Sequence, residues 1–466
     1  MRARGTRDVR PALTSPAGRS AAGLGLTGEQ YLDRLDDVHF ALGYGRMAKG
    51  RQKVSRWENG VNSPELPARY AMGRLHGIPR ETVTELGWPD FLLLAFPDDR
   101  PVLDSPWTLA GTVTAVAAAA RGGSMQDRRG FLIASGTTLS GLATSWSLAL
   151  AEPAAALPAV PAKVSAVNTR LTPALLDVLE QRLDDLRRLD DVLGGARLRQ
   201  TAVAEYELLN GLAARTGQHG PLEHRLLSLL AESARMCGWL QFDTGHHARA
   251  QRFYITALRA SATAGDHQVG ANTLAFMAIQ VYSKGNPREA VDLVRTAQDA
   301  TARKATPRVK SMLHARAARA LSKTGERTAC QRELDAARTE YARGPHDDDP
   351  SWSYWLNDGE IEMLAGSSAL DLDDPRRALT HFDQARHVQY AADGYVRDHV
   401  LYLTRTARAH LQLGDLDAAC AVATDAFTQN TTLNSSRPSD ALDDLRDELT
   451  PHRNVRVVRD FLLLSI

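Results

Sequence analysis

Cysteine is scarce in this chain of 466 residues. Its three cysteines, Cys237, Cys330 and Cys420, lie far apart and form no CxxC pair, so neither a disulfide framework nor a structural zinc site is expected. HExxH, GxSxG and P-loop motifs are also missing, and the GxGxxG pattern at residues 23–28 follows no predicted strand. We therefore predict no catalytic site, no cofactor and no bound metal.

Net charge is also lacking. The 56 Lys and Arg residues nearly balance the 55 Asp and Glu residues, which leaves a formal charge of +1. Any contact with nucleic acid must therefore come from local segregation of charge. Residues 1–22 contain no apolar run of the kind found in a secretory signal. We predict that they form a disordered tail and that the protein is cytoplasmic.

Strand patterns are nearly absent, whereas apolar residues recur at spacings of three and four, which is the helical pattern. The sequence predicts an all-α protein with a compact unit over residues 23–96. An Ala/Gly/Ser-rich linker follows over residues 97–163, and a helical domain covers residues 164–466.

An internal repeat divides the helical domain. Five similar segments begin at Gly245, Gly285, Gly325, Asp373 and Gly414. Small residues recur five and twelve positions after each start, and the second set steps by 40, 40, 48 and 41 residues. The two sets are Ala250, Ala290, Cys330, Ala378 and Ala419, and Ala257, Ala297, Ala337, Ala385 and Ala426.

This spacing predicts pairs of antiparallel helices. The Gly or Asp at each start fits a tight turn, and the small residues fit places where two helices approach closely. Larger residues would fill the groove between the helices, namely Tyr254, Val294, Leu334 and Phe382. The pattern resembles a tetratricopeptide array with a period longer than the usual length of about 34 residues. The resemblance implies an α-α superhelix whose concave groove takes a peptide, small-molecule or protein ligand. A generic Ala-rich helical bundle is the alternative.

A second motif lies near the N-terminus, where residues 53–60 read KVSRWENG and Pro64 follows shortly after. Val54 and Trp57 are three positions apart, so one face of a helix would carry both into a small core. Gly60 suits the residue that ends this helix. The segment resembles the end of the recognition helix in lambda-repressor/Cro-type helix-turn-helix regulators, the xenobiotic-response-element class.

Charge segregation accompanies this motif, because residues 38–57 contain no Asp or Glu. The resemblance implies that Arg51, Gln52 and Lys53 begin the recognition helix, which would contact base edges and phosphates of double-stranded DNA as a homodimer. The candidate DNA-binding residues are Arg46, Lys49, Arg51, Gln52, Lys53, Ser55, Arg56 and Asn59.

The region expected to form helix two of this module departs from the family pattern. Residues 43–50 include Gly43 and Gly45, and each glycine weakens a helix by about 1 kcal/mol. Lys49 stands where a buried aliphatic residue is usual. The alternative interpretation is a vestigial module attached to a helical-repeat scaffold that binds other proteins.

Two further features leave alternatives open. Arg128 and Arg129 precede a long uncharged stretch, which predicts a small-residue helix packed on the first repeats. An export signal of the twin-arginine type and a membrane helix, which would make this an exported or anchored repeat protein, are less favoured. We expect no stable membrane insertion.

Trp352, Tyr354 and Trp355 fit either a helix core or a cluster facing a ligand. The order of these parts resembles that of actinomycete regulators of development and secondary metabolism.

Overall fold

The computed structural model describes residues 28–48, 57, 63–88, 91–92, 100–121, 137–151, 171–214, 220–283, 286–387, 396–431 and 435–464. Within these ranges every long regular element is an α-helix and no strand is present. The prediction of an all-α protein is thus confirmed. None of the helices in these ranges is long and apolar enough to cross a membrane.

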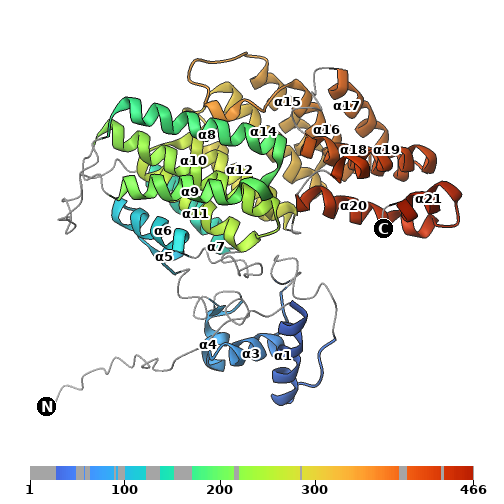
Figure 1. The fold of residues 1–466 in the computed structure, drawn as a ribbon, viewed down its shortest axis with the longest axis horizontal. Helices are drawn as coiled ribbons and strands as arrows, with labels where there is room; N and C mark the ends of the chain where they lie inside the picture. Colours follow the sequence, from blue (N-terminus) through green and yellow to red (C-terminus); the bar gives the residue numbers. More distant parts are fainter. Residues whose placement is uncertain are drawn as a thin grey trace.

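Three N-terminal helices form a cluster of their own (Figure 1). They are α1 (Gly28–Ala41), α3 (Leu66–Leu75) and α4 (Arg80–Leu86). Tyr31 and Leu35 of α1, Met72 of α3 and Val83 of α4 are almost fully buried in one shared core. The chain after the KVSRWENG motif forms α3 and then a turn at Gly77, whose φ is +71°.

The expectation of a helix over the start of residues 43–50 is wrong for the part that the structure describes. Helix α1 ends at Ala41, and residues 42–48 form a turn and an irregular segment. Gly43 and Gly45 have φ angles of +83° and +81°, in the left-handed region that favours glycine. These two glycines therefore end α1 and redirect the chain.

The described part of residues 97–163 is helical and packs on the array, although a linker was predicted there. It forms α5 (Arg100–Asp104), α6 (Leu109–Arg121) and α7 (Thr137–Ala151). Trp146 of α7 is fully buried and its indole nitrogen donates to the Ser261 hydroxyl at 3.1 Å. Arg259 donates to the carbonyl oxygens of Val102 and Leu103 at 2.8 and 2.5 Å. The prediction of a small-residue helix packed on the first repeats is confirmed.

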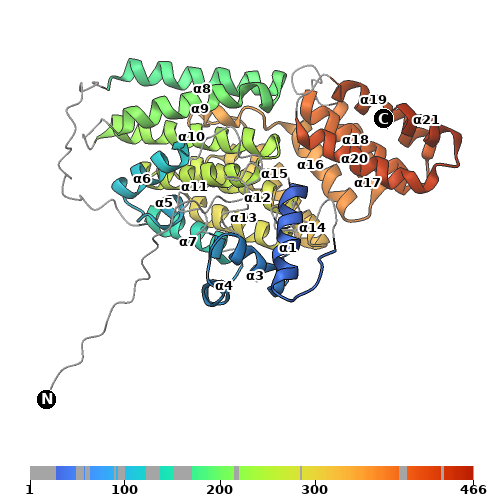
Figure 2. The same cartoon turned by 60° about the horizontal axis from the view of Figure 1, so that its bottom comes forward.

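The rest of the described chain consists of antiparallel helical pairs stacked side by side (Figures 1 and 2). The stack begins with α8 (Pro173–Leu193) and α9 (Gly195–Ala213). Six further pairs follow: α10 (Pro221–Asp243) with α11 (His247–Ala264), α12 (His267–Ser283) with α13 (Pro287–Thr301), α14 (Pro307–Lys323) with α15 (Arg327–Tyr341), α16 (Asp358–Asp371) with α17 (Pro375–His387), α18 (Val396–Gln412) with α19 (Leu416–Asn430), and α20 (Ser436–Leu449) with α21 (Arg456–Leu464).

The predicted turn residues lie in the tight turns of these pairs. Gly245, Gly325 and Gly414 have φ angles of +80°, +81° and +77°. Asp373 has a φ of +57° and is the one non-glycine with positive φ among the residues that the structure describes. Gly285 lies outside those residues. The repeated Gly or Asp thus reflects a left-handed conformation that other residues adopt at a cost.

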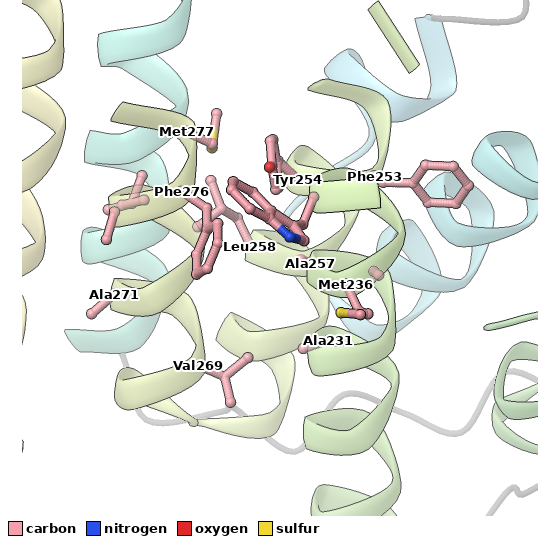
Figure 3. Close-up of a cluster of buried hydrophobic side chains, with 14 of the residues drawn as sticks. Ala231, Met236, Phe253, Tyr254, Ala257, Leu258, Val269, Ala271, Phe276 and Met277 are labelled. Carbon is pink, nitrogen blue, oxygen red and sulfur yellow. The ribbon is translucent and has the colours of Figure 1, made fainter. Parts of the chain in front are cut away.

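The small repeated residues are buried where the helices of a pair meet. All ten positions of the two predicted sets are at most 1% exposed. Tyr254 fills the groove of its pair and faces Gly238, where an added Cβ would lie 2.5 Å from the ring. Phe382 faces Gly366 in the same way. Figure 3 shows Tyr254 within this core. The predicted close approaches are confirmed at these positions.

The longest step of the repeat, 48 residues, corresponds to an extended loop between α15 and α16. This loop contains the short 3-10 helix η3 (Ser351–Ser353) and reaches back to the start of the array. The Ser351 hydroxyl donates to Asp184 at 2.9 Å, and Tyr354 donates a short hydrogen bond to Asp191. Both acceptors lie on α8, so the insertion connects distant pairs.

Candidate functional site

The candidate DNA-binding segment lies largely outside the described residues. Of the eight predicted residues the structure describes only Arg46. The other seven, Lys49, Arg51, Gln52, Lys53, Ser55, Arg56 and Asn59, lie in ranges whose structure is not described. Their role remains a prediction from the sequence.

Arg46 connects the segment after α1 to that helix. Its Nη1 atom donates to Asp36 at 3.0 Å and to Asp37 at 2.8 Å, and its guanidinium lies 4.6 Å from the centre of the Phe40 ring. Asp36 is buried and also accepts a hydrogen bond from the Met47 backbone at 2.7 Å. Arg46 therefore holds the segment in place, while its side chain is still 58% exposed.

Trp57 fixes the end of the basic stretch to the N-terminal core. The residue is 4% exposed and belongs to the same buried cluster as Tyr31 and Met72. This confirms the prediction that Trp57 enters the small core. The chain that precedes it carries five cations and no carboxylate over residues 38–57.

A second candidate site is a cavity that the helical array partly encloses, which we call the array cavity. The first helices of successive pairs line it, from α8 through α20, together with the loop that contains η3. Phe276 and Met236, labelled in Figure 3, are two of its apolar residues. Its aromatic lining consists of Trp239, Phe276, Tyr282, Trp352, Tyr354, Trp355 and Tyr402.

The sequence left two interpretations open for the aromatic residues Trp352, Tyr354 and Trp355 of the inserted loop: a helix core, or a cluster that faces a ligand. They belong to η3 and the turn after it rather than to an α-helix, and all three line the array cavity. Trp352 is 5% exposed, so its ring is also part of the wall. The sequence signal for this placement was the step of 48 residues between repeats.

Arginines dominate the charge of this cavity, since seven arginines and four carboxylates line it. The arginines are Arg187, Arg235, Arg316, Arg319, Arg397, Arg405 and Arg437. The sequence analysis identified none of these arginines as site residues, because they are spread over 250 residues of the chain.

Four of the seven arginines have close carboxylate partners. Arg187 and Arg235 both bind Glu232, at 3.1 and 2.8 Å. Arg319 binds Asp371 at 2.6 Å, and Arg397 of α18 binds Asp190 of α8 at 3.0 Å. The Arg397 pair joins the first and the last third of the array. These arginines have a structural role that their ion pairs explain.

The other three arginines differ. Arg316 and Arg405 form no ion pair with a carboxylate of the described ranges, and Arg437 approaches only Asp243, at 3.8 Å. Each lies against an aromatic ring instead, with centroid distances of 5.0 Å to Trp355, 5.3 Å to Tyr402 and 4.8 Å to Trp239. Arg405 also donates to the Ser367 hydroxyl at 3.0 Å.

Tyr282 of α12 lies at the centre of the positive charge. Burial alone would raise the pKa of its phenol, but Arg316, Arg319, Arg405 and Arg437 together bring that pKa below its usual value. Burial also lowers the pKa of Arg405, and the neighbouring Arg319 lowers it further. The array cavity thus contains a region in which positive charge exceeds negative charge.

Two of the lining carboxyls, Glu360 and Asp191, compensate little of the positive charge of the cavity. Burial raises the pKa of Glu360 to about 7, and the charge of Asp398 adds to that effect. Burial likewise raises the pKa of Asp191 to about 7. Glu360 accepts hydrogen bonds from the Tyr402 hydroxyl at 2.8 and 2.9 Å. Near neutral pH each carboxyl therefore carries only part of a negative charge.

Asn272 of α12 adds a neutral polar group to the wall. The residue is 1% exposed, and its Oδ1 atom has no hydrogen-bond partner among the described residues. A buried amide oxygen without a donor is destabilising by about 1–3 kcal/mol. This atom is an acceptor for a ligand that brings an N–H or O–H group.

Metal-binding geometry is not found in the described ranges, where no group of three or more His, Cys, Asp or Glu side chains converges. Cys237, Cys330 and Cys420 are all buried and unpaired with one another. Comparison of the chain with known protein families, curated proteins and solved structures gave no match.

Proposed function

We propose that this protein is a transcriptional regulator of the cytoplasm that binds double-stranded DNA through its N-terminal unit and a ligand through its helical array. The observation that carries the proposal is the buried position of Trp57. It attaches the end of a stretch with five cations and no carboxylate to a small helical core, and a local concentration of cations provides the phosphate contacts that DNA binding needs.

A helical array with an internal cavity supports the sensing half of the proposal. Ligand sites are concave and combine apolar or aromatic side chains with polar groups that fix the orientation of the ligand, and the array cavity combines aromatic residues with a larger number of charged ones. We further propose that the protein acts as a homodimer on a two-fold DNA site, arranged as a helix-turn-helix unit followed by a tetratricopeptide-like superhelix. Ligand binding would then change the affinity for DNA only if it distinguishes two arrangements of the dimer.

The direct test replaces two cations of the predicted recognition helix in the full chain, Arg51→Ala with Lys53→Ala. Retention of mixed-sequence duplex DNA is measured as a function of salt concentration. Each lost phosphate contact reduces the slope of log K against log salt by about 0.9. We therefore expect weaker binding and a slope reduced by about 1 to 2.

The matched control removes the same charge elsewhere in the N-terminal unit. Arg34 of α1 and Arg74 of α3 are both exposed, so Arg34→Ala with Arg74→Ala changes the net charge equally. Equal losses in the two double variants would show that only bulk charge matters. Unchanged binding in the Arg51→Ala, Lys53→Ala variant would contradict the proposal and favour a scaffold with a vestigial module.

A further inference from the structure

The cations without close partners converge on one part of the array cavity. Arg316 comes from α14, Arg405 from α18 and Arg437 from α20, and all three act on the phenol of Tyr282 from α12. Helices that are far apart in the chain therefore bring like charges together in a partly enclosed space. Like charges in such a space repel strongly unless a counter-charge is present.

Structural ion pairing does not explain Arg316 and Arg405, and it explains Arg437 only through Asp243 at 3.8 Å. The paired arginines of the same cavity show how this fold neutralises a structural cation, since Glu232, Asp371 and Asp190 lie within 3.1 Å of their arginines. Arg316 and Arg405 have no such carboxylate in the described part of the chain. The Nε atom of Arg316 and the Nη1 atom of Arg437 are buried there without a hydrogen-bond acceptor.

Aromatic rings surround the same cations. Trp239 and Phe276 meet edge to face with centroids 5.0 Å apart, and Trp355 lies beside Arg316. Arginines already lie over the Trp239 and Phe276 rings, so a flat apolar group would pack against the parts of these rings that line the cavity while its charged group faces the arginines. The Oδ1 atom of Asn272, which has no partner in the described residues, would accept a hydrogen bond from the same molecule.

We propose that the array cavity binds a small organic anion, with its carboxylate or phosphate among Arg316, Arg405 and Arg437 and its aromatic body against Trp239, Phe276 and Trp355. This proposal defines the ligand class of the regulator proposed above, and its role as a signal rests on that function. The binding itself is independent of DNA.

The test measures binding of simple probes to the full chain by isothermal titration calorimetry. Naphthoate and naphthyl phosphate carry the two anionic groups on one aromatic body, naphthamide is the neutral counterpart, and inorganic phosphate lacks the body. We expect at least one naphthyl anion to bind roughly tenfold or more tightly than naphthamide and inorganic phosphate, because a charge-assisted hydrogen bond contributes more than a neutral one.

Arg405→Met tests the site, and Arg408→Met is its matched control. Arg408 is on the same helix but donates to Glu448 at 2.9 Å, outside the cavity lining. We expect Arg405→Met to weaken binding of the naphthyl anion by roughly tenfold or more while leaving naphthamide binding unchanged. It should also raise the Tm of the ligand-free protein, because it removes like-charge repulsion. Arg408→Met should do neither.

Three results would overturn the proposal: no binding of either naphthyl anion, equal affinity for naphthamide, or equal losses in Arg405→Met and Arg408→Met. A lower Tm for ligand-free Arg405→Met together with unchanged anion binding would show that Arg405 is structural. DNA retention is measured separately. Loss of DNA binding in Arg51→Ala, Lys53→Ala with normal anion binding, or the reverse, distinguishes a failure of this proposal from a failure of the DNA-binding proposal.

Discussion

Gly238→Ala adds a single methyl group where α10 packs against Tyr254 of α11. Its carbon would lie 2.5 Å from both Cδ1 and Cε1 of Tyr254, and Tyr254 is fully buried. The corresponding positions of the next pair are occupied by Ala278 and Val294, and both are fully buried as well. A glycine thus accompanies the large ring, and an alanine accompanies the smaller side chain.

Two opposing terms set the size of the effect. Replacing glycine by alanine inside a helix stabilises it by about 1 kcal/mol. Overpacking a rigid core is destabilising by about 1–3 kcal/mol. Because Tyr254 is fully buried, we expect the overpacking term to be the larger one and the free energy of unfolding to fall by about 1–2 kcal/mol.

A second substitution separates these terms. In a Tyr254→Leu background the clash disappears, so Gly238→Ala should stabilise the protein by up to about 1 kcal/mol. The coupling between the two sites is then about 2–3 kcal/mol. Urea denaturation of all four proteins, followed by tryptophan fluorescence and circular dichroism, measures it.

Gly141→Ala in α7 is the control, because nothing lies within 4 Å of a Cβ at that position. It should stabilise the protein by about 0.5–1 kcal/mol through helix propensity alone. If Gly238→Ala stabilised the protein as Gly141→Ala does, the steric explanation of the repeat would be wrong. Effects of Gly238→Ala and Tyr254→Leu that add within about 0.5 kcal/mol would contradict it equally.

Two further predictions concern charged groups. Burial lowers the pKa of His76 to about 4, so its contribution to stability is present above pH 6.5 and is lost as the pH falls towards 4, by at most roughly 1.4 kcal/mol per pH unit. The hydrogen-exchange protection factors of α1 and α3 amides, which correct each rate for the intrinsic effect of pH, should fall over that range, and less so in His76→Gln. Arg397→Met leaves Asp190 buried without its closest cation and should destabilise the array by about 3–5 kcal/mol. Amides of α8 should then exchange faster, whereas unchanged exchange there would contradict a role in joining the ends of the array.

Local signals explain why the helical pairs were predictable. A left-handed turn restricts the residue to glycine or a short polar side chain, and a close helix contact restricts it to a small one. Gly325 and Asp373 meet the first condition, and Ala337 and Ala385 meet the second. Both conditions act within a single helical pair, so the residues that meet them recur at a constant spacing in the sequence.

Composition alone misled the prediction of a linker. Small residues occur in flexible segments, but they also allow helices to pack closely, and α7 belongs to the second case. Gly270 shows the reason, because an added Cβ there would lie 2.3 Å from the Trp146 ring. The better signal was the tryptophan itself, within a stretch that has no charged residue between Arg129 and Glu152.

The array cavity could not have been predicted from spacing. It combines residues from Arg187 to Arg437, and their meeting depends on the curvature that accumulates over successive pairs. One part of the cavity could have been predicted from the sequence. The extra length before α16 marks the inserted loop that brings Trp352 and Trp355 to the cavity. The partners of each arginine are long-range contacts that no local pattern encodes.

Stability alone is a poor reason for such a cavity. Replacing buried ion pairs by apolar side chains of similar volume is often neutral or stabilising by about 1–4 kcal/mol. The array already has a large core of alanines, leucines and aromatic residues as far as Ala365, and separate apolar clusters lie between its later helices. Arg316 and Arg405 form no ion pair with a carboxylate of the described ranges, and Arg437 has only Asp243 at 3.8 Å, so the mutual repulsion of the three opposes folding. Residues that weaken a fold and converge on one cavity are better explained by what they bind than by what they stabilise.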